Sequence, residues 1–96
     1  MKKPLVVRTE ALRILADLPK SSRDLCQDSI FQLVEAFGRP HQHLGLSIRK
    51  LKPSVFECRA GLDLRILFVN HAEGLVVAFT GTHDEIQAEL RTGKYG

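Results

Sequence analysis

Two apolar series on either side of Gly61 constrain the fold of this chain more than any other feature of its sequence. They are Phe56, Cys58 and Ala60 before the glycine, and Leu62, Leu64, Ile66 and Phe68 after it. Alternation of this kind is typical of strands that bury one face, and a one-residue slip would split the two series across opposite faces of a sheet. The pattern therefore predicts an antiparallel hairpin over 55–70, with a turn of three residues around Gly61.

The same register predicts that four charged residues lie on the opposite face of the hairpin. They are Glu57, Arg59, Asp63 and Arg65. One interpretation is a solvated sheet face with Arg–Glu and Arg–Asp cross-strand pairs. The other is a surface whose arginines bind an anionic partner, which the formal net charge of +3 favours only slightly.

Before the hairpin, the apolar period changes from that of a strand to that of a helix. A short first strand is predicted over 5–8, followed by a helix that ends at Pro19 and has an apolar stripe of Ala11, Ile14, Leu15 and Leu18. A second helix is predicted to begin with Ser21 or Ser22 as its N-cap and to stop before Gly38. Its apolar face has two rows, Leu25, Ser29, Leu33 and Phe37 beside Cys26, Ile30 and Val34. Such a broad face suits a helix that covers a sheet.

The remaining pattern predicts two more strands, over 48–52 and 75–80, and a last helix. The strand over 75–80 is apolar on both faces, so we expect it inside the sheet. Thr82 and Glu85 fit a capping box that starts the last helix. His83 then takes the first helical position, where it serves either as a general acid or base or only as a polar residue at an exposed helix start.

These elements predict one domain over 1–96 of the α+β class. An N-terminal strand and a two-helix hairpin pack on a four-stranded, mainly antiparallel sheet with a short C-terminal helix. The apolar runs are too short for a signal peptide or a membrane span, so we expect a cytoplasmic protein that binds no membrane.

Cysteine and histidine usage gives no sign of a disulfide framework or a metal site. Cys26 and Cys58 lie in apolar surroundings and are expected to be reduced core residues. His41 and His43 form an H-x-H pair in the loop over 39–47, but the sequence offers no third ligand. We expect both to be loop residues and the protein to need no metal.

Four short segments, in this order and spacing, resemble the RelE/ParE toxin superfamily and within it the RelE/YafQ-like branch. They are Lys50-Leu51-Lys52, Phe56-Glu57-Cys58-Arg59, Arg65-Ile66-Leu67-Phe68 and Gly81-Thr82-His83. The resemblance implies a RelE-like fold and the toxin of a type II toxin–antitoxin system, which a cognate antitoxin wraps and neutralises.

The resemblance also implies an activity, namely a ribosome-dependent mRNA interferase. Such an endoribonuclease inhibits translation by cleaving mRNA through attack of the 2′-OH, without metal or cofactor. By position, Arg59 and Arg65 are implied to bind phosphate and stabilise the transition state, and His83 to act as general acid or base. The basic strand is implied to supply the RNA-binding residues Arg49, Lys50 and Lys52.

Two alternatives remain open. A ParE-like inhibitor of DNA gyrase has the same fold, although the Gly81-Thr82-His83 segment counts against it. A degenerate, non-catalytic relative is the other, because no aromatic residue follows His83 closely and the only tyrosine is Tyr95. A catalytic role for Tyr95 or His43, and a homodimer or a heterotetramer with the antitoxin, are also left open.

Overall fold

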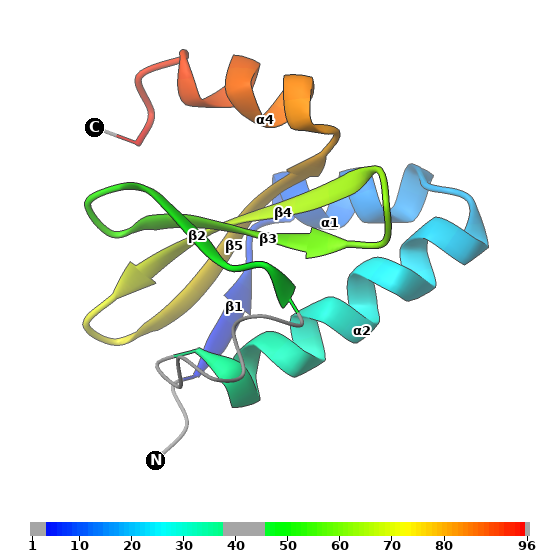
Figure 1. Cartoon of the computed structure of the whole chain (residues 1–96), viewed down its shortest axis with the longest axis horizontal. Coiled ribbons are helices and arrows are strands. Elements are labelled where there is room, and N and C mark those ends of the chain that lie inside the picture. Colours follow the sequence, from blue (N-terminus) through cyan, green and yellow to red (C-terminus); the bar gives the residue numbers. More distant parts are fainter. Residues whose placement is uncertain (1–3, 38–45, 96) are drawn as a thin grey trace.

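The computed structural model describes residues 4–37 and 46–95 and contains a five-stranded mixed sheet of order β1-β5-β4-β3-β2. The strands are β1 (Leu5–Val7), β2 (Arg49–Lys52), β3 (Val55–Ala60), β4 (Leu64–His71) and β5 (Gly74–Gly81), and the helices are α1 (Thr9–Asp17), α2 (Lys20–Ala36) and α4 (His83–Leu90). β1 runs parallel to β5, and every other pair is antiparallel. Figure 1 shows α1 and α2 together on one side of the sheet and α4 apart from them, near the C-terminus. The predicted α+β class is confirmed.

The predicted register of the β3–β4 hairpin is confirmed. Phe56 pairs with Phe68, Cys58 with Ile66, and Ala60 with Leu64. All six side chains belong to the core beneath α1 and α2. Burial of the two apolar series on one face therefore selects this register.

The start of β4 differs from the prediction, although the length of the turn does not. The turn occupies 61–63 and begins at Gly61, whose φ of 76° is one that residues with a side chain rarely adopt. Leu62 and Asp63 are therefore turn residues rather than strand residues, and Leu62 is 90% exposed. The expected places of Leu62 on the buried face and of Asp63 on the charged face were wrong.

The inner face of α2 lies on the sheet, largely as its periodicity predicts. Its buried residues are Cys26, Ser29, Ile30, Leu33 and Ala36. Phe37 contacts Phe56 and Phe68 edge-to-face, at centroid distances of 5.1 and 5.5 Å. Leu25, expected in the same buried row, is 48% exposed and lies beside the Gly61 turn.

The predicted N-cap of α2 was wrong. The helix begins at Lys20 with Pro19 as its N-cap, and no side chain caps it. Proline fixes φ near the value that a helix start needs, so the chain passes from α1 into α2 without a serine cap. Gly38, His41 and His43 lie outside the described residues.

The two cysteines are free and buried, as expected. Desolvation by burial raises the pKa of the Cys58 thiol to about 12, so this thiol stays protonated and unreactive at neutral pH. None of the helices in the described part of the chain has the length and apolar character that a membrane span needs.

The face of the sheet opposite α1 and α2 is partly covered by α4. Ile86, fully buried, packs there with Val55, Leu67 and Val69, and Phe79 and Leu90 border this second cluster. The sheet therefore separates two apolar clusters. The charged residues of β3 and β4 lie on the side of α4, next to its starting point.

Candidate active site

Arg59 and Arg65 lie directly opposite each other on β3 and β4. Arg59 is exposed, whereas the side chain of Arg65 is only 19% exposed. Like charges in directly opposed positions destabilise a sheet, and Arg59 forms no ion pair with any residue that the structure describes. Packing alone does not account for this pair. The two arginines concentrate positive charge at this place, and a bound anion would neutralise it.

The N-terminus of α4 lies next to this arginine pair. Arg65 pairs with Gly81 of β5, and His83 follows as the first residue of α4. The predicted capping box is confirmed: the Thr82 amide donates to Glu85 Oε1 at 2.8 Å, and the Glu85 amide donates to Thr82 Oγ1 at 3.3 Å. The capping box fixes the start of α4 and thereby the position of His83, its first residue. His83 is exposed at this edge of the sheet.

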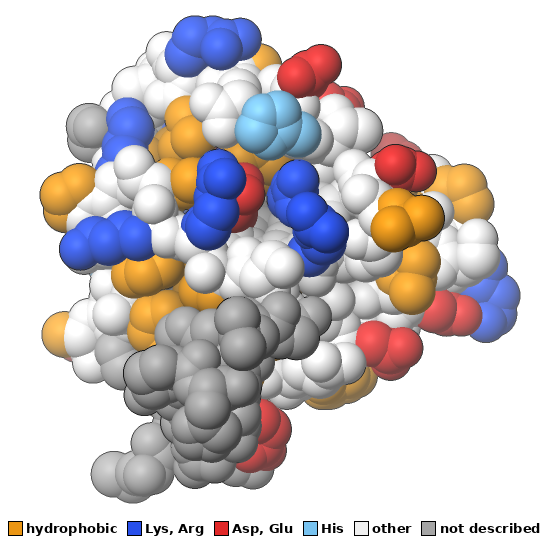
Figure 2. Space-filling model, in the orientation of Figure 1, with side chains coloured by type: hydrophobic (Ala, Val, Ile, Leu, Met, Phe, Trp, Pro, Cys, Tyr) orange, Lys and Arg blue, Asp and Glu red, His pale blue; other side chains and the backbone are white. Residues whose placement is uncertain are grey.

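Gly81 allows β5 to pass directly into this cap. A Cβ atom at Gly81 would lie 2.9 Å from Glu85 Cβ and 3.1 Å from a ring carbon of Phe79. Because Glu85 Cβ lies close to its own backbone, it cannot move aside without moving the helix. Glycine therefore brings the helix start, and with it His83, close to the end of β4 where Arg65 lies. Figure 2 shows Lys and Arg side chains gathered around a histidine on this face.

Glu57 has a different environment from the one that its sequence pattern predicts. The carboxylate is 2% exposed, so a fully solvated charged face was wrong at this position. Its Oε2 atom lies 3.4 Å from Arg49 Nε and 3.9 Å from Arg65 Nε. Its Oε1 atom accepts no hydrogen bond from the described residues. The chain therefore buries one carboxylate between two arginines at the edge of the candidate site.

The structure places two of the three basic residues of β2 on the face of the arginine pair. Arg49 lies opposite Glu57, and Lys52 lies opposite Val55, which belongs to the cluster beneath α4. Lys50 lies opposite Phe56, whose ring packs in the core beneath α1 and α2. The side chain of Lys50 therefore leaves the sheet on the other face, away from Arg59 and Arg65.

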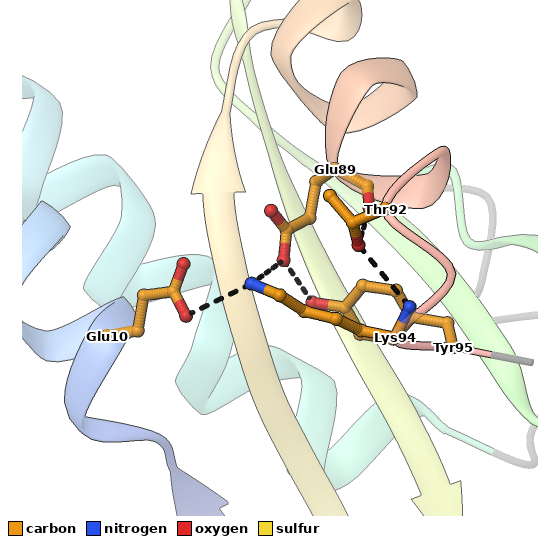
Figure 3. A network of polar contacts seen from close by, with 5 residues as sticks. All are labelled: Glu10, Glu89, Thr92, Lys94 and Tyr95. Carbon is orange, nitrogen blue, oxygen red and sulfur yellow. Dashed lines mark hydrogen bonds and ion pairs between the residues drawn. The ribbon is translucent and has the colours of Figure 1, made fainter.

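Tyr95 belongs to a polar network at the C-terminal end of α4, which Figure 3 shows, whereas His83 begins that helix. The Tyr95 hydroxyl donates to Glu89 Oε2 at 2.7 Å, and Lys94 Nζ lies 3.5 Å from the same oxygen and 3.7 Å from Glu10 Oε2. Burial and the hydrogen bond to Glu89 raise the pKa of Tyr95. These contacts hold the C-terminal segment against α4 and α1.

A cavity of about 200 Å³ beside Tyr95 marks the far end of this sheet face. It is lined by Arg8, Pro53, Ser54, Val55, Val69, His71, Lys94 and Tyr95. His71 ends β4, so the cavity lies roughly 20 Å along that strand from Arg65. The described arrangement does not bring Tyr95 to the arginine pair. Within 4–37 and 46–95, no group of three or more His, Cys, Asp or Glu residues could hold a metal ion.

The sequence placed Glu57 among the charged residues of this face but did not predict that it is buried beside the arginine pair. The alternation of apolar and charged residues along β3 correctly predicts that Glu57 lies on the same face as Arg59 and Arg65. It does not predict how deeply the side chain is buried. Glu57 lies between β2 and β4, opposite Arg49 on one strand and Leu67 on the other. The burial of Glu57 could have been inferred from the pairing of the basic strand β2 with the segment Phe56–Arg59, because that pairing places Arg49 opposite Glu57.

A comparison with models of known protein families gives no match, and neither does a comparison with the sequences of curated proteins. Solved structures do match. The archaeal RelE–RelB complex of Pyrococcus horikoshii gives a TM-score of 0.69 at 15% identity, covering 85% of this chain and 96% of the other.

Two bacterial toxin–antitoxin complexes match over a similar extent. DinJ–YafQ from E. coli gives a TM-score of 0.70 at 11% identity, with 90% of this chain and 98% of the other covered. RelBE2 from Mycobacterium tuberculosis gives 0.67 at 19% identity, with 86% and 100% covered. At such low identity the likeness concerns the fold. Across most of its length, the chain has the RelE-like fold found in these toxin–antitoxin complexes.

Proposed function

We propose that this protein is the toxin of a type II toxin–antitoxin system and acts as a ribosome-dependent mRNA interferase. One observation carries the proposal: two directly opposed arginines, of which only Arg65 has an acidic partner, lie beside a histidine at a capped helix start on one face of a RelE-like fold. Two opposed arginines do not stabilise a sheet. They can bind a phosphodiester group, and the histidine beside them can transfer a proton during its cleavage.

The proposed reaction uses the RNA's own 2′-OH as nucleophile. The 2′-oxygen loses its proton and attacks the adjacent phosphorus, the bond to the 5′-oxygen breaks, and the products carry a 2′,3′-cyclic phosphate and a 5′-OH. Negative charge grows on the phosphoryl oxygens in the transition state, where Arg59 and Arg65 stabilise it. His83 either accepts the proton of the 2′-OH, as general base, or donates a proton to the leaving 5′-oxygen, as general acid, and water takes the other role.

RNA would follow the basic residues that share this face. Arg49 and Lys52 stand on β2 beside the arginine pair and are proposed to contact the RNA backbone. Lys50, implied as a third contact by the family resemblance, faces the other side of the sheet and is not included in this surface. The mRNA on the ribosome is the proposed substrate.

The proposed partner is a cognate antitoxin that covers this face. The matching P. horikoshii, E. coli and M. tuberculosis proteins were each crystallised in complexes whose names pair a toxin with its antitoxin. By analogy, an antitoxin that supplies acidic side chains to Arg59 and Arg65 would block phosphate binding.

Expression without the antitoxin tests the proposal. The wild-type protein is expected to arrest growth, with protein synthesis falling before DNA replication. His83→Ala and Arg65→Ala are expected to relieve the arrest, while His71→Ala and Arg13→Ala, exposed residues outside the proposed site, should remain toxic. Full toxicity of both site variants would refute the assignment. Replication that stalls first would indicate a gyrase inhibitor instead.

A further inference from the structure

Among the residues that the structure describes, Glu57 is the one buried carboxylate that contacts the candidate site, and the proposed reaction does not use it directly. It comes from the middle of β3, with Arg49 directly opposite on β2 and Leu67 directly opposite on β4. Arg65 is its diagonal neighbour, one strand away and two residues along. Long side chains reach such diagonal neighbours across a sheet.

The surroundings of Glu57 would suit an apolar residue better if packing were its only role. Leu67, on the same face, is fully buried, and Val55, two residues earlier on β3, is 2% exposed. A carboxylate in this position loses most of its hydration, which is costly unless charged partners replace the water. The Nε atoms of Arg49 and Arg65 supply that compensation at 3.4 and 3.9 Å, both at Oε2.

Arg65 is the partner that matters for the chemistry. The side chain of Arg49 is 62% exposed, so water already solvates its charge. The side chain of Arg65 is 19% exposed and faces the uncompensated charge of Arg59. Repulsion by Arg59 would drive Arg65 away from the pair toward solvent. The carboxylate of Glu57 attracts it from the opposite side.

We propose that Glu57 is a positioning residue that holds the guanidinium of Arg65 beside Arg59, so that both can contact one phosphate group. The proposal rests on the proposed function. One carboxylate cannot neutralise three guanidinium groups, so the face stays positive while the charge of Glu57, 3.9 Å from Arg65 Nε, attracts that side of the guanidinium. The terminal nitrogens of Arg65 are then left to the phosphate, in the bidentate manner that guanidinium groups favour.

Two opposite expectations follow for Glu57→Gln. If Glu57 only lowers the positive field, removing its charge should strengthen RNA binding and leave cleavage intact or faster. If it positions Arg65, ribosomes carrying a 2′-O-methylated mRNA should bind the variant as tightly as before or tighter, while single-turnover cleavage of unmodified mRNA on ribosomes slows about tenfold or more, because misplaced transition-state contacts are costly. A cleavage rate equal to that of the wild type would overturn the proposal.

A double-mutant cycle separates positioning from a general structural role. In an Arg65→Gln background, Glu57→Gln should cause no further loss of cleavage rate, because its effect passes through Arg65. In an Arg59→Gln background it should still slow the residual cleavage, because the ion pair between Glu57 and Arg65 remains, but by less than in the wild type, because the repulsion from Arg59 is gone. Equal losses in both backgrounds would overturn the proposal. If Glu57→Gln fails to fold, Glu57→Asp keeps the charge, shortens the reach to Arg65 and should also slow cleavage.

A measurement without RNA keeps this inference separate from the proposed function. The side chain of Arg65 is 19% exposed, so if Glu57 holds it in place, hydrogen exchange of its Nε–H group, followed by ¹⁵N NMR, should be faster in Glu57→Gln than in the wild type, because the side chain moves toward water. The exposed Arg59 Nε–H is the internal reference and should not change. If the wild type cleaves no RNA but shows this dependence, the function fails and the Glu57–Arg65 contact stands. Exchange at Arg65 that is unaffected by the substitution would overturn the contact itself.

Discussion

Arg59 and Arg65 occupy directly opposed positions on neighbouring strands, and their charges repel each other on the face that α4 leaves accessible. Glu57 compensates Arg65 but not Arg59. A chain that keeps such a pair accepts a loss of stability at this place. Such an arrangement is expected of a binding site for an anionic ligand, because the ligand then supplies the negative charge that Arg59 lacks.

Removing the charge of Arg59 should stabilise the protein while abolishing its toxicity. Arg59→Gln is expected to raise the free energy of unfolding by roughly 0.2–1 kcal/mol, the range for opposed pairs on a sheet. Urea unfolding at low ionic strength measures the change, and growth assays measure the loss of activity.

Salt and a matched arginine provide the controls for this prediction. The gain from Arg59→Gln should shrink at about 1 M salt, where charges are screened within about 3 Å. Arg13→Gln, on the exposed side of α1, should change stability little at either ionic strength. Destabilisation by Arg59→Gln would show that the opposed pair is not repulsive.

Loss of the α4 cap should weaken both the helix and the site. Thr82→Ala removes the oxygen that accepts from the Glu85 amide and is expected to cost about 0.5–2 kcal/mol. Because His83 is the next residue, the same change should reduce toxicity. Thermal unfolding and growth assays report the two effects.

Ser21→Ala is the matched control for this cap. Ser21 lies at the start of α2, but no side chain caps that helix. Its replacement should therefore leave stability almost unchanged. A loss as large as that of Thr82→Ala would contradict the assignment of Pro19 as N-cap.

The hydroxyl of Tyr95 should contribute measurably to the packing of the C-terminal segment. Tyr95→Phe removes the 2.7 Å hydrogen bond to Glu89, a carboxylate that is 8% exposed, and should cost about 1–3 kcal/mol. Chemical unfolding measures the loss. In a Glu89→Gln background, Tyr95→Phe should lower the free energy of unfolding by less. An equal loss in both backgrounds would show that Tyr95 does not act through its hydrogen bond to Glu89.

Stability should fall with rising pH above neutrality, in part because of Cys58. Burial raises the pKa of this thiol from its ordinary value of 9.0 to about 12. The unfolded chain therefore releases the proton first, and stabilisation that is complete below pH 9.0 is lost as the pH rises toward about 12.

Unfolding free energies measured from pH 8 to about 11 test this contribution. Cys58→Ala should give a shallower decline than the wild type, whatever its stability at neutral pH. The raised pKa of Tyr95 acts in the same direction and remains in both proteins. Identical slopes for the two proteins would exclude a role for Cys58.

Sequence patterns predicted the parts of the fold that a strong periodicity specifies. The alternation around Gly61 gave the register that sets Arg59 against Arg65, and the residues Thr82 and Glu85 gave the cap that places His83. Both features are local, so each depends on a short segment and one kind of contact. The pairing of Arg65 with Gly81, which brings the two together, is a finding of the structure, and only the family resemblance implied that they share a site.

The sequence could not predict features that depend on three elements at once. Glu57 is buried on β3 between Arg49 of β2 and Arg65 of β4, whereas its alternation with apolar residues suggested only a charged face. The opposite direction of Lys50 follows from pairing with Phe56 and from a bulge between Lys50 and Lys52. The exposure of Leu62 follows from where the turn begins, a shift of two residues that apolar character alone does not reveal.

Primer extension on a defined mRNA in a reconstituted translation system tests the central claim most directly. Wild-type protein should produce cuts within the codon in the ribosomal A site, and none when ribosomes are left out. Folded His83→Ala should produce almost no cuts, and His71→Ala should cut like the wild type. The same cuts with His83→Ala, or none with a wild-type protein that arrests growth, would contradict the proposal that this face cleaves mRNA on the ribosome.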